Sequence, residues 1–149
     1  MQVIRILAIK GSATYTITPD KTLTEAIAIM VEHDIGSLVC MDVGQLVGML
    51  TFREVLKTIK QLGAGAGATL VGKTMVRDPQ CVPATAETNE LRQIMLRSHA
   101  RYLPVLEGER FVGVVSFHDV ARAVLEEQGM ENQQLKDYIA GHPSGVAMA

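Results

Sequence analysis

The stretch Gly48-Met-Leu-Thr-Phe-Arg-Glu54 returns 65 residues later as Gly113-Val-Val-Ser-Phe-His-Asp119, and this repetition decides the fold. Around it, residues 16–57 align with residues 81–122 without a gap. A repeat of this length is one supersecondary unit used twice, so the sequence predicts two small related units. Identical pairs in the alignment include Glu25/Glu90, Ile29/Ile94, Met30/Met95, Leu38/Leu103, Phe52/Phe117 and Val55/Val120.

Each copy has the pattern of a short strand, a helix, a strand hairpin and a second helix. In the first copy, Thr22 or Thr24 can cap a helix whose apolar residues recur every three or four positions. Two apolar runs then flank the turn Asp42-Val-Gly-Gln45, which is typical of a hairpin. A helix is expected from Phe52 to about Leu62. The second copy predicts a helix at 87–98, strands at 102–106 and 111–116, and a helix at 117–127.

The rest of the chain is divided around these two copies. Gly63-Ala-Gly-Ala-Gly-Ala68 predicts a flexible linker, because its glycines disfavour regular structure. Gly129 is expected to separate the last helix of the second copy from a further, polar helix. The predicted fold class is α+β, with two β-α-β-β-α units packed through their sheets as a pseudo-two-fold pair. The expected segments are an N-terminal helix at 1–9, units at 10–62 and 71–128 joined by a linker at 63–70, a C-terminal helix at 129–141 and a disordered tail at 142–149.

Composition argues against several classes of function. The net charge is −2, with both signs spread along the chain, so no basic surface for nucleic acid is predicted. The apolar runs fall well short of the roughly 20 residues that a membrane helix needs. Cys40 and Cys81 lie in strand-like apolar stretches and are expected to be core thiols, with a disulfide between them as the alternative. These features predict a cytoplasmic protein.

Gly67-Ala-Thr-Leu-Val-Gly72-Lys73-Thr74 matches the phosphate-loop pattern of nucleoside triphosphatases. Such a loop leaves a buried parallel strand and enters a long helix, so that backbone N–H groups converge on the phosphates. Here a Gly/Ala segment precedes the match, and Asp78-Pro79 follows within little more than one helical turn. We therefore expect a chance match. The alternative, a small triphosphatase that uses Lys73, would lose its activity in Lys73→Ala.

The repeated phrase carries a hydroxyl residue followed three positions later by an acid: Thr51 with Glu54, and Ser116 with Asp119. At the start of a helix this pair forms a capping box, which explains the pattern without a ligand. The same groups could instead hold a ligand, because a carboxylate accepts hydrogen bonds from a ribose diol and a helix N-terminus favours phosphate. Both readings stay open at this point. His33, His99, His118 and His142 show no metal-ligand spacing with the cysteines, and no metal site or catalytic role is predicted for them.

The two copies resemble the cystathionine-β-synthase-type (CBS) domain, whose units end in Gly-apolar-apolar-Ser/Thr-x-x-Asp, and the tandem resembles a Bateman module. The resemblance covers nearly the whole chain and is closest to stand-alone CBS-pair proteins of the IMP dehydrogenase-like kind, without the catalytic barrel. It is carried by Lys10-Gly11-Ser12, Tyr15-Thr16-Ile17-Thr18-Pro19, Arg101-Tyr-Leu-Pro-Val105 and the ending from Glu127 to Gly141. The resemblance implies a non-enzymatic sensor of adenosine ligands, a homodimer that signals to an effector protein.

The resemblance also implies two nucleotide sites, one for each copy. In the second-copy site, Asp119 would hold the ribose, Ser116 the ribose or phosphate, and Arg101 the phosphate. Backbone groups at Pro79, Gln80, Tyr102 and Leu103 would read the adenine, Tyr102 and Pro104 would form an apolar wall, and His118 would lie beside the acid. The first-copy site would comprise Lys10, Thr14, Tyr15, Gly36, Ser37, Leu38, Thr51, Arg53 and Glu54.

The two implied sites are unequal, because Glu54 stands where the family has Asp and reaches one methylene further. We therefore expect the second-copy site to bind a mononucleotide better. The regulatory ligand could be AMP, ADP, ATP, NAD(H) or S-adenosylmethionine, since all of these contain the adenosine that the implied residues would hold. No catalytic cofactor is implied. The alternative function is a ligand-free scaffold for dimerisation or protein interaction.

Overall fold

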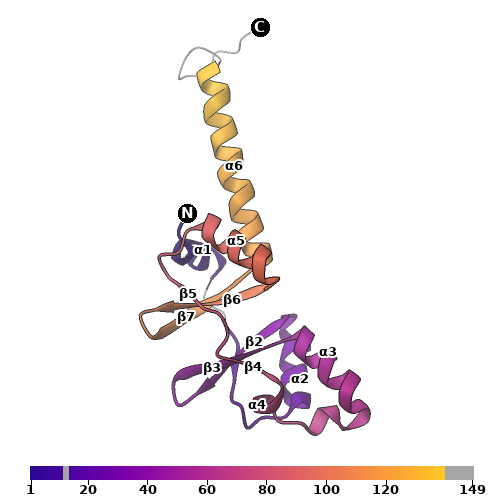
Figure 1. The fold of residues 1–149 in the computed structure, drawn as a ribbon. Coiled ribbons are helices and arrows are strands. Elements are labelled where there is room, and N and C mark those ends of the chain that lie inside the picture. Colours follow the sequence, from indigo (N-terminus) through magenta and orange to yellow (C-terminus); the bar gives the residue numbers. More distant parts are fainter. Residues whose placement is uncertain (12–13, 140–149) are drawn as a thin grey trace.

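The fold was analysed in a computed structural model that describes residues 1–11 and 14–139 (Figure 1). It consists of two small α/β units and a long C-terminal helix that projects from the second unit. The tail expected at 142–149 lies outside the described residues. This arrangement confirms the expected fold class, a pair of β-α-β-β-α units.

The first unit is built on a four-stranded sheet with the order β1-β2-β3-β4. The hairpin β2–β3 turns at Val43 and Gly44, which both have positive φ, and β1 runs parallel to β2. Two helices complete the unit, and Thr22 caps the first of them in a capping box with Glu25. The elements are β1 (Thr16–Ile17), α2 (Leu23–His33), β2 (Ser37–Asp42), β3 (Gln45–Thr51), α3 (Phe52–Leu62) and β4 (Val76–Arg77).

The second unit repeats this plan with a three-stranded sheet of order β5-β6-β7. As in the first unit, the short first strand is parallel to the second, and the last two strands form an antiparallel hairpin. The units contact each other through β3 and β7. The elements are β5 (Val82–Pro83), α5 (Thr88–Ser98), β6 (Tyr102–Glu107), β7 (Arg110–Ser116) and α6 (Phe117–Ile139).

Two further helices, α1 (Val3–Lys10) and α4 (Val71–Thr74), each precede one unit in the sequence but dock on the other. In α1, the Val3 N–H donates to the carbonyl oxygen of Ala86 (2.8 Å) in the second unit. In α4, the Val71 N–H donates to the carbonyl oxygen of Lys21 (2.8 Å) in the first unit. β4 likewise joins the first sheet beside β3. Residues 71–77 therefore pack with the first unit, although the sequence analysis placed them in the second.

Each unit has its own apolar core. In the first unit, α2 and the strands bury Leu23, Met30, Leu38 and Leu50 together with Val71 from α4. In the second unit, the core formed by α5, β6 and β7 includes Val3 and Ile6, so α1 is part of that core. The thiol of Cys40 is buried and free, and burial raises its pKa to about 12. That burial matches its expected place in the core.

Two expectations about the connecting segments are wrong. Gly63–Ala68 is not an irregular linker but the 3-10 helix η1, and it buries Ala66 against the first unit. Gly129 does not separate two helices, because α6 continues through it from Phe117 to Ile139. A glycine inside a helix costs only about 1 kcal/mol relative to alanine, which flanking helix formers can offset.

Candidate functional site

Both copies of the repeated phrase form the strand-to-helix corner that the sequence predicts. At the start of α6, the Ser116 N–H donates to Asp119 Oδ2 (2.9 Å) and the Asp119 N–H donates to Ser116 Oγ (3.1 Å). At the start of α3, the Thr51 N–H and hydroxyl both donate to Glu54 Oε1, at 2.9 and 2.6 Å. The capping role of both pairs is therefore confirmed, and it places each acid at a defined point beside its helix start.

Asp119 has a second partner that Glu54 lacks among the described residues. The Lys10 ammonium lies 2.8 Å from Asp119 Oδ2 and 3.1 Å from the carbonyl oxygen of Val114, to both of which it donates. Burial by itself raises the pKa of the Asp119 carboxyl. The hydrogen bonds from Lys10 and from the Ser116 N–H, with the positive charge of Lys10, outweigh burial and hold that pKa below its ordinary value. Asp119 is thus ionised at neutral pH.

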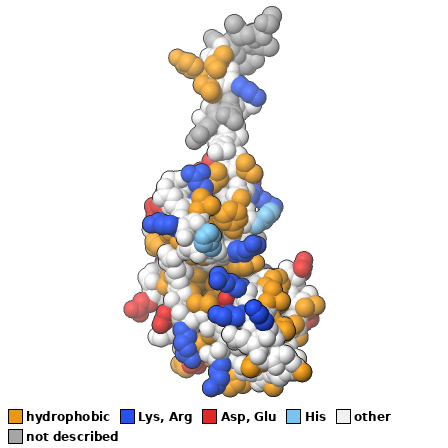
Figure 2. Space-filling model, turned by 45° about the vertical axis from the view of Figure 1, so that its right-hand side comes forward, with side chains coloured by type: hydrophobic (Ala, Val, Ile, Leu, Met, Phe, Trp, Pro, Cys, Tyr) orange, Lys and Arg blue, Asp and Glu red, His pale blue; other side chains and the backbone are white. Residues whose placement is uncertain are grey.

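Asp119 and Lys10 line a cavity of about 1130 Å³ where the two units and α1 meet. This volume is ample for a small organic ligand, whose pockets measure roughly 300–1,000 Å³. Figure 2 shows Lys and Arg side chains gathered near the middle of one face, next to hydrophobic side chains. Ten of the predicted site residues line the cavity: Lys10, Thr14, Tyr15, Gly36, Ser37, Arg101, Tyr102, Ser116, His118 and Asp119.

The grouping of these residues differs from the expectation of one site for each copy. Lys10, Thr14 and Tyr15 belong to the first copy in sequence but share the cavity with the second-copy acid Asp119. The cause is the docking of α1 on the second unit, which brings Lys10, at the end of α1, to Asp119 at the start of α6. Eight predicted residues do not line this cavity: Leu38, Thr51, Arg53, Glu54, Pro79, Gln80, Leu103 and Pro104. Of these, Leu38, Leu103 and Pro104 are buried in the fold.

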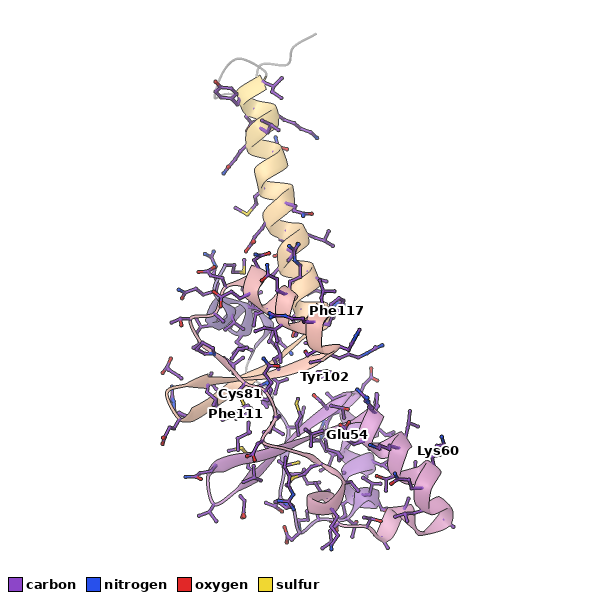
Figure 3. The ribbon with its side chains drawn as sticks, viewed as in Figure 1. Glu54, Lys60, Cys81, Tyr102, Phe111 and Phe117 are labelled. Carbon is purple, nitrogen blue, oxygen red and sulfur yellow. The ribbon has the colours of Figure 1, made fainter. Side chains whose placement is uncertain are left out.

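The wall between the units includes a close contact of Tyr102 with Gly36. A Cβ built on Gly36 would lie 2.1 Å from the Tyr102 hydroxyl oxygen, so the absence of a side chain there makes room for the phenol. Figure 3 shows Tyr102 at the edge of the second unit that faces the first, while Lys60 points outward from α3. Tyr15, on the first-unit wall, stacks on His33 with ring centroids 3.9 Å apart. The cavity therefore has aromatic side chains on both walls.

Two of the backbone N–H groups at the start of α6 are already engaged. The Phe117 N–H donates to the carbonyl oxygen of Arg101 (2.7 Å), and the Asp119 N–H donates to Ser116 Oγ. The helix start consequently offers an anion less backbone support than the sequence pattern suggested. The side chains of Lys10 and Arg101 line the cavity and could meet an anion there.

The sequence analysis missed several cavity residues. Asp34 and His99 end α2 and α5 in left-handed conformations and line the cavity, as do Ile4 and Leu7 of α1. Asp34 and His99 could have been found from the repeat, because they occupy the same position in the two copies. In each copy this position is the end of a helix that comes shortly before a strand. No local signal marks Ile4 and Leu7, since their role depends on where α1 docks.

The phosphate-loop match does not form a phosphate site. The N–H groups of Val71, Gly72 and Lys73 donate to the carbonyl oxygens of Lys21, Pro19 and Leu70. The helix that follows is α4, only four residues long, and the segment before it is η1 rather than a strand. A Cβ on Gly67 would lie 2.4 Å from Thr24 Oγ1, so this glycine serves packing. Within the described residues, no cluster of metal-binding side chains and no helix able to span a membrane is found.

Comparison with known proteins agrees with this architecture. The model of the CBS domain family matches residues 12–61 and 71–126. The chain is 36% identical over 129 residues to the mitochondrial CBS domain-containing protein CBSX3 of Arabidopsis thaliana, covering 83% of this chain and 63% of that protein, less than two thirds of its length. The CBS-domain protein ATU1752 of Agrobacterium tumefaciens superposes with a TM-score of 0.79 at 30% identity, covering 83% of this chain and 98% of that one. A putative signal-transduction protein of Burkholderia ambifaria gives 0.80 at 28% identity, covering 86% and 96%.

Two more distant structures share the fold and contain adenosine ligands. CBSX2 in complex with AMP has a TM-score of 0.68 at 22% identity, covering 77% of this chain and 90% of that one. The CBS pair of MJ0100, in complex with 5′-methylthioadenosine and S-adenosyl-L-methionine, has a TM-score of 0.74 at 22% identity, covering 85% and 98%. Stand-alone proteins of the CBS domain family are generally non-catalytic. The family match, the tandem units and these relatives show that the chain belongs to the CBS domain family and carries two CBS units in tandem.

Proposed function

We propose that this chain is a regulatory module that senses an adenosine-containing nucleotide in the cavity between its two CBS units. The observation that carries the proposal is the position of Asp119. Its carboxylate is ionised, is held in place by the Ser116 cap, and lines a cavity with Lys10 and Arg101. An acceptor carboxylate beside two cations suits a ligand that has both sugar hydroxyls and phosphate.

Each part of such a ligand has a matching group in the cavity. The ribose diol would donate hydrogen bonds to Asp119, and charge-assisted bonds of this kind contribute about 1.5–3 kcal/mol each. The phosphate would lie near Lys10 and Arg101, because arginine can form two parallel hydrogen bonds with it. The adenine would pack against the apolar and aromatic surface that includes Tyr102 and Ala100. Micromolar binding needs about 8.2 kcal/mol, so the polar contacts and the packing of the adenine must both contribute.

The complexes of CBSX2 and MJ0100 support an adenosine ligand, because AMP, 5′-methylthioadenosine and S-adenosylmethionine share that moiety. AMP, ADP, ATP, NAD(H) and S-adenosylmethionine are the candidates for this chain. Among them, we favour an anionic nucleotide, since Lys10 and Arg101 add positive charge to the cavity. The ligand would act as a regulator rather than as a catalytic cofactor.

We infer one preferred site for each chain. Among the described residues, Glu54 contacts Thr51 but no cation that corresponds to Lys10. The neighbourhood of Glu54 also differs from that of Asp119, because α4 ends at Thr74 and is followed by β4, whereas α1 continues for another turn to Lys10. The start of α3 is therefore the weaker candidate for a mononucleotide.

The ligand would act on the association of the protein with a second copy and with an effector. One face of α3 exposes Phe52, Leu56 and Ile59, which are spaced at one and two helical turns and form an apolar stripe (the α3 stripe). Exposed apolar stripes of this kind mark contact surfaces. We propose that the α3 stripe lies in a homodimer interface. The same stripe favours the alternative function, a scaffold without a ligand.

A thermal-shift experiment separates the sensor from the scaffold. A sensor gains stability RT ln(1 + [L]/Kd), about 2.7 kcal/mol at a ligand concentration of 100 Kd. AMP, ADP, ATP, NAD and S-adenosylmethionine would be compared, with guanosine monophosphate as the base control. The sensor predicts a concentration-dependent rise in Tm with at least one adenosine compound. A scaffold predicts no rise with any of them.

A further inference from the structure

The carboxylate proposed to receive the ribose is already occupied by a cation of the chain itself. The Lys10 ammonium is 2.8 Å from Asp119 Oδ2 and 3.1 Å from the Val114 carbonyl oxygen. Lys10 is the last residue of α1, and Asp119 lies in the first turn of α6. The contact therefore joins two elements that are remote in sequence and lies on the surface of the cavity.

Lys10 is the partner of Asp119 that can move. The hydrogen bond from the Ser116 N–H to Asp119 belongs to the helix cap and is fixed by the backbone. The Lys10 side chain, by contrast, is 40% exposed and reaches Asp119 through a flexible four-carbon chain. Oδ2 already accepts from the Ser116 N–H and from Lys10, which uses both of its lone pairs. A ribose diol that donates one hydroxyl to each carboxylate oxygen therefore displaces Lys10 from Oδ2.

We propose, on the basis of the proposed nucleotide function, that Lys10 is a specificity-determining residue that favours phosphorylated nucleosides over neutral ones. A neutral nucleoside that takes over Asp119 weakens the ion pair and leaves the ammonium without an equivalent anion. A nucleotide supplies a phosphate that can accept the hydrogen bonds Lys10 loses. Competition for Asp119 therefore lowers the affinity for the nucleoside more than the affinity for the nucleotide.

The charge of the site leads to the same result. Lys10 and Asp119 together are neutral, so the phosphate meets no net repulsion from the pair. Without Lys10, the Asp119 carboxylate stays in place, only 16% exposed, and its unscreened charge opposes a nearby phosphate. Removing Lys10 therefore has opposite effects on the two ligand types: it weakens binding of the nucleotide and frees Asp119 for the nucleoside.

Titration calorimetry with AMP and adenosine tests this inference on wild type, Lys10→Met and Lys10→Arg. We expect wild type to prefer AMP by about tenfold or more, the factor that one charge-assisted hydrogen bond supplies. Lys10→Met should lower this preference by about tenfold or more while binding adenosine at least as tightly. Lys10→Arg should keep the preference for AMP. Lys73→Met, which alters an exposed lysine of α4 outside the cavity, serves as the matched control.

The outcomes separate this inference from the proposed function. If Lys10→Met binds AMP and adenosine with the wild-type ratio, the inference is wrong and the nucleotide site stands. An equal loss of affinity for both ligands in this variant, with a wild-type circular dichroism spectrum, also contradicts the inference. Such a result would mean that Lys10 supports the site in general and does not distinguish the two ligands. If wild type binds neither compound, nor any other adenosine ligand of the thermal-shift series, the proposed function itself fails.

Discussion

The ammonium of Lys10 lies 2.8 Å from Oδ2 of Asp119, across 109 positions of the chain. This distance is short for an ion pair and falls in the range of charge-assisted hydrogen bonds. It exists because α1 docks on the second unit, where its first residues contact Ala84 and Ala86. Asp119, which lines the cavity, is thus paired with an element that precedes the other unit in the sequence.

The Lys10–Asp119 pair predicts a specific loss of stability in acid. Because the folded-state pKa of Asp119 lies below its ordinary value of 3.8, its ionised form contributes stability above that value. The contribution is lost as pH falls through the lower folded-state pKa. Asp119→Asn removes the charge but can still accept the hydrogen bond from Ser116. We expect it to be less stable than wild type at pH 7, and the difference to shrink once pH falls below about 4.

Urea unfolding at a series of pH values measures this difference. The difference in the free energy of unfolding between wild type and Asp119→Asn could instead stay constant from neutral pH to below about pH 4. That result would contradict the prediction and attribute the lost stability to packing rather than to ionisation. Glu107→Gln, which removes an exposed ion pair with Arg110 on the distant hairpin turn, is the control and should change stability by less than about 1 kcal/mol.

Gly36 and Tyr102 should be energetically coupled. In Gly36→Ala the new Cβ would lie 2.1 Å from the Tyr102 hydroxyl oxygen, so the phenol must move, at a cost of about 1–3 kcal/mol. Tyr102→Phe deletes this nearest atom and leaves Cζ, at 3.1 Å, as the next. We expect Gly36→Ala to cost clearly less in the Tyr102→Phe background. A double-mutant cycle by chemical denaturation measures the coupling, and strict additivity would contradict the contact.

Gly129 provides a test of the uninterrupted helix α6. A Cβ at Gly129 would meet no atom within 4 Å, and the residue lies inside the helix. Gly129→Ala should therefore stabilise α6 by about 0.5–1 kcal/mol and raise the helical signal in circular dichroism. Gly44→Ala is the matched control. Its Cβ would also meet nothing, but its φ of +75° disfavours alanine, so it should destabilise. A loss of stability in Gly129→Ala would indicate a helix end at that position.

The α3 stripe should control the oligomeric state. Leu56 is 65% exposed, so Leu56→Lys should leave the fold intact, with a change in stability within about 0.5 kcal/mol. We expect sedimentation velocity to show a dimer for wild type and a monomer for this variant. Lys57→Glu, an exposed residue of the same helix that lies outside the face of the stripe, should remain dimeric. Wild-type protein that stays monomeric at high concentration, or a dimeric Leu56→Lys, would contradict this assignment.

The elements of both units could be predicted from the sequence because their signals are local. The apolar periodicity, the turn around Gly44 and the capping pairs each act within a few residues. The repeat shows each kind of signal twice, once in each copy, which strengthens the prediction. The docking of α1 and α4 on the opposite units could not be predicted, because it depends on tertiary hydrogen bonds such as that from Val71 to Lys21. The glycines at Gly63–Ala68 and Gly129 led to wrong predictions of a linker and of a helix break. Tertiary packing at the first place and flanking helix formers at the second override the low helix propensity of glycine.

The residues of the candidate site fall into the same two groups, those that a local sequence signal reveals and those whose place depends on tertiary docking. Ser116 and Asp119 could be found from the repeated phrase, because a capping box has a fixed spacing. The membership of Lys10, Thr14 and Tyr15 in the Asp119 cavity could not, since sequence order assigns them to the other unit. The asymmetry expected from Glu54 remains a prediction. The structure adds a reason for it, namely the Lys10 contact at Asp119.

Calorimetric titration of AMP into wild type, Asp119→Ala and Glu54→Ala tests whether the Asp119 carboxylate holds the ligand. We expect wild type to bind one mole of AMP per mole of chain. Asp119→Ala should lose affinity by about tenfold or more, as expected when one charge-assisted hydrogen bond is removed. Glu54→Ala, the matched change in the first copy, should keep the wild-type affinity and stoichiometry. Unchanged AMP affinity in Asp119→Ala would contradict the claim that this carboxylate holds the ligand.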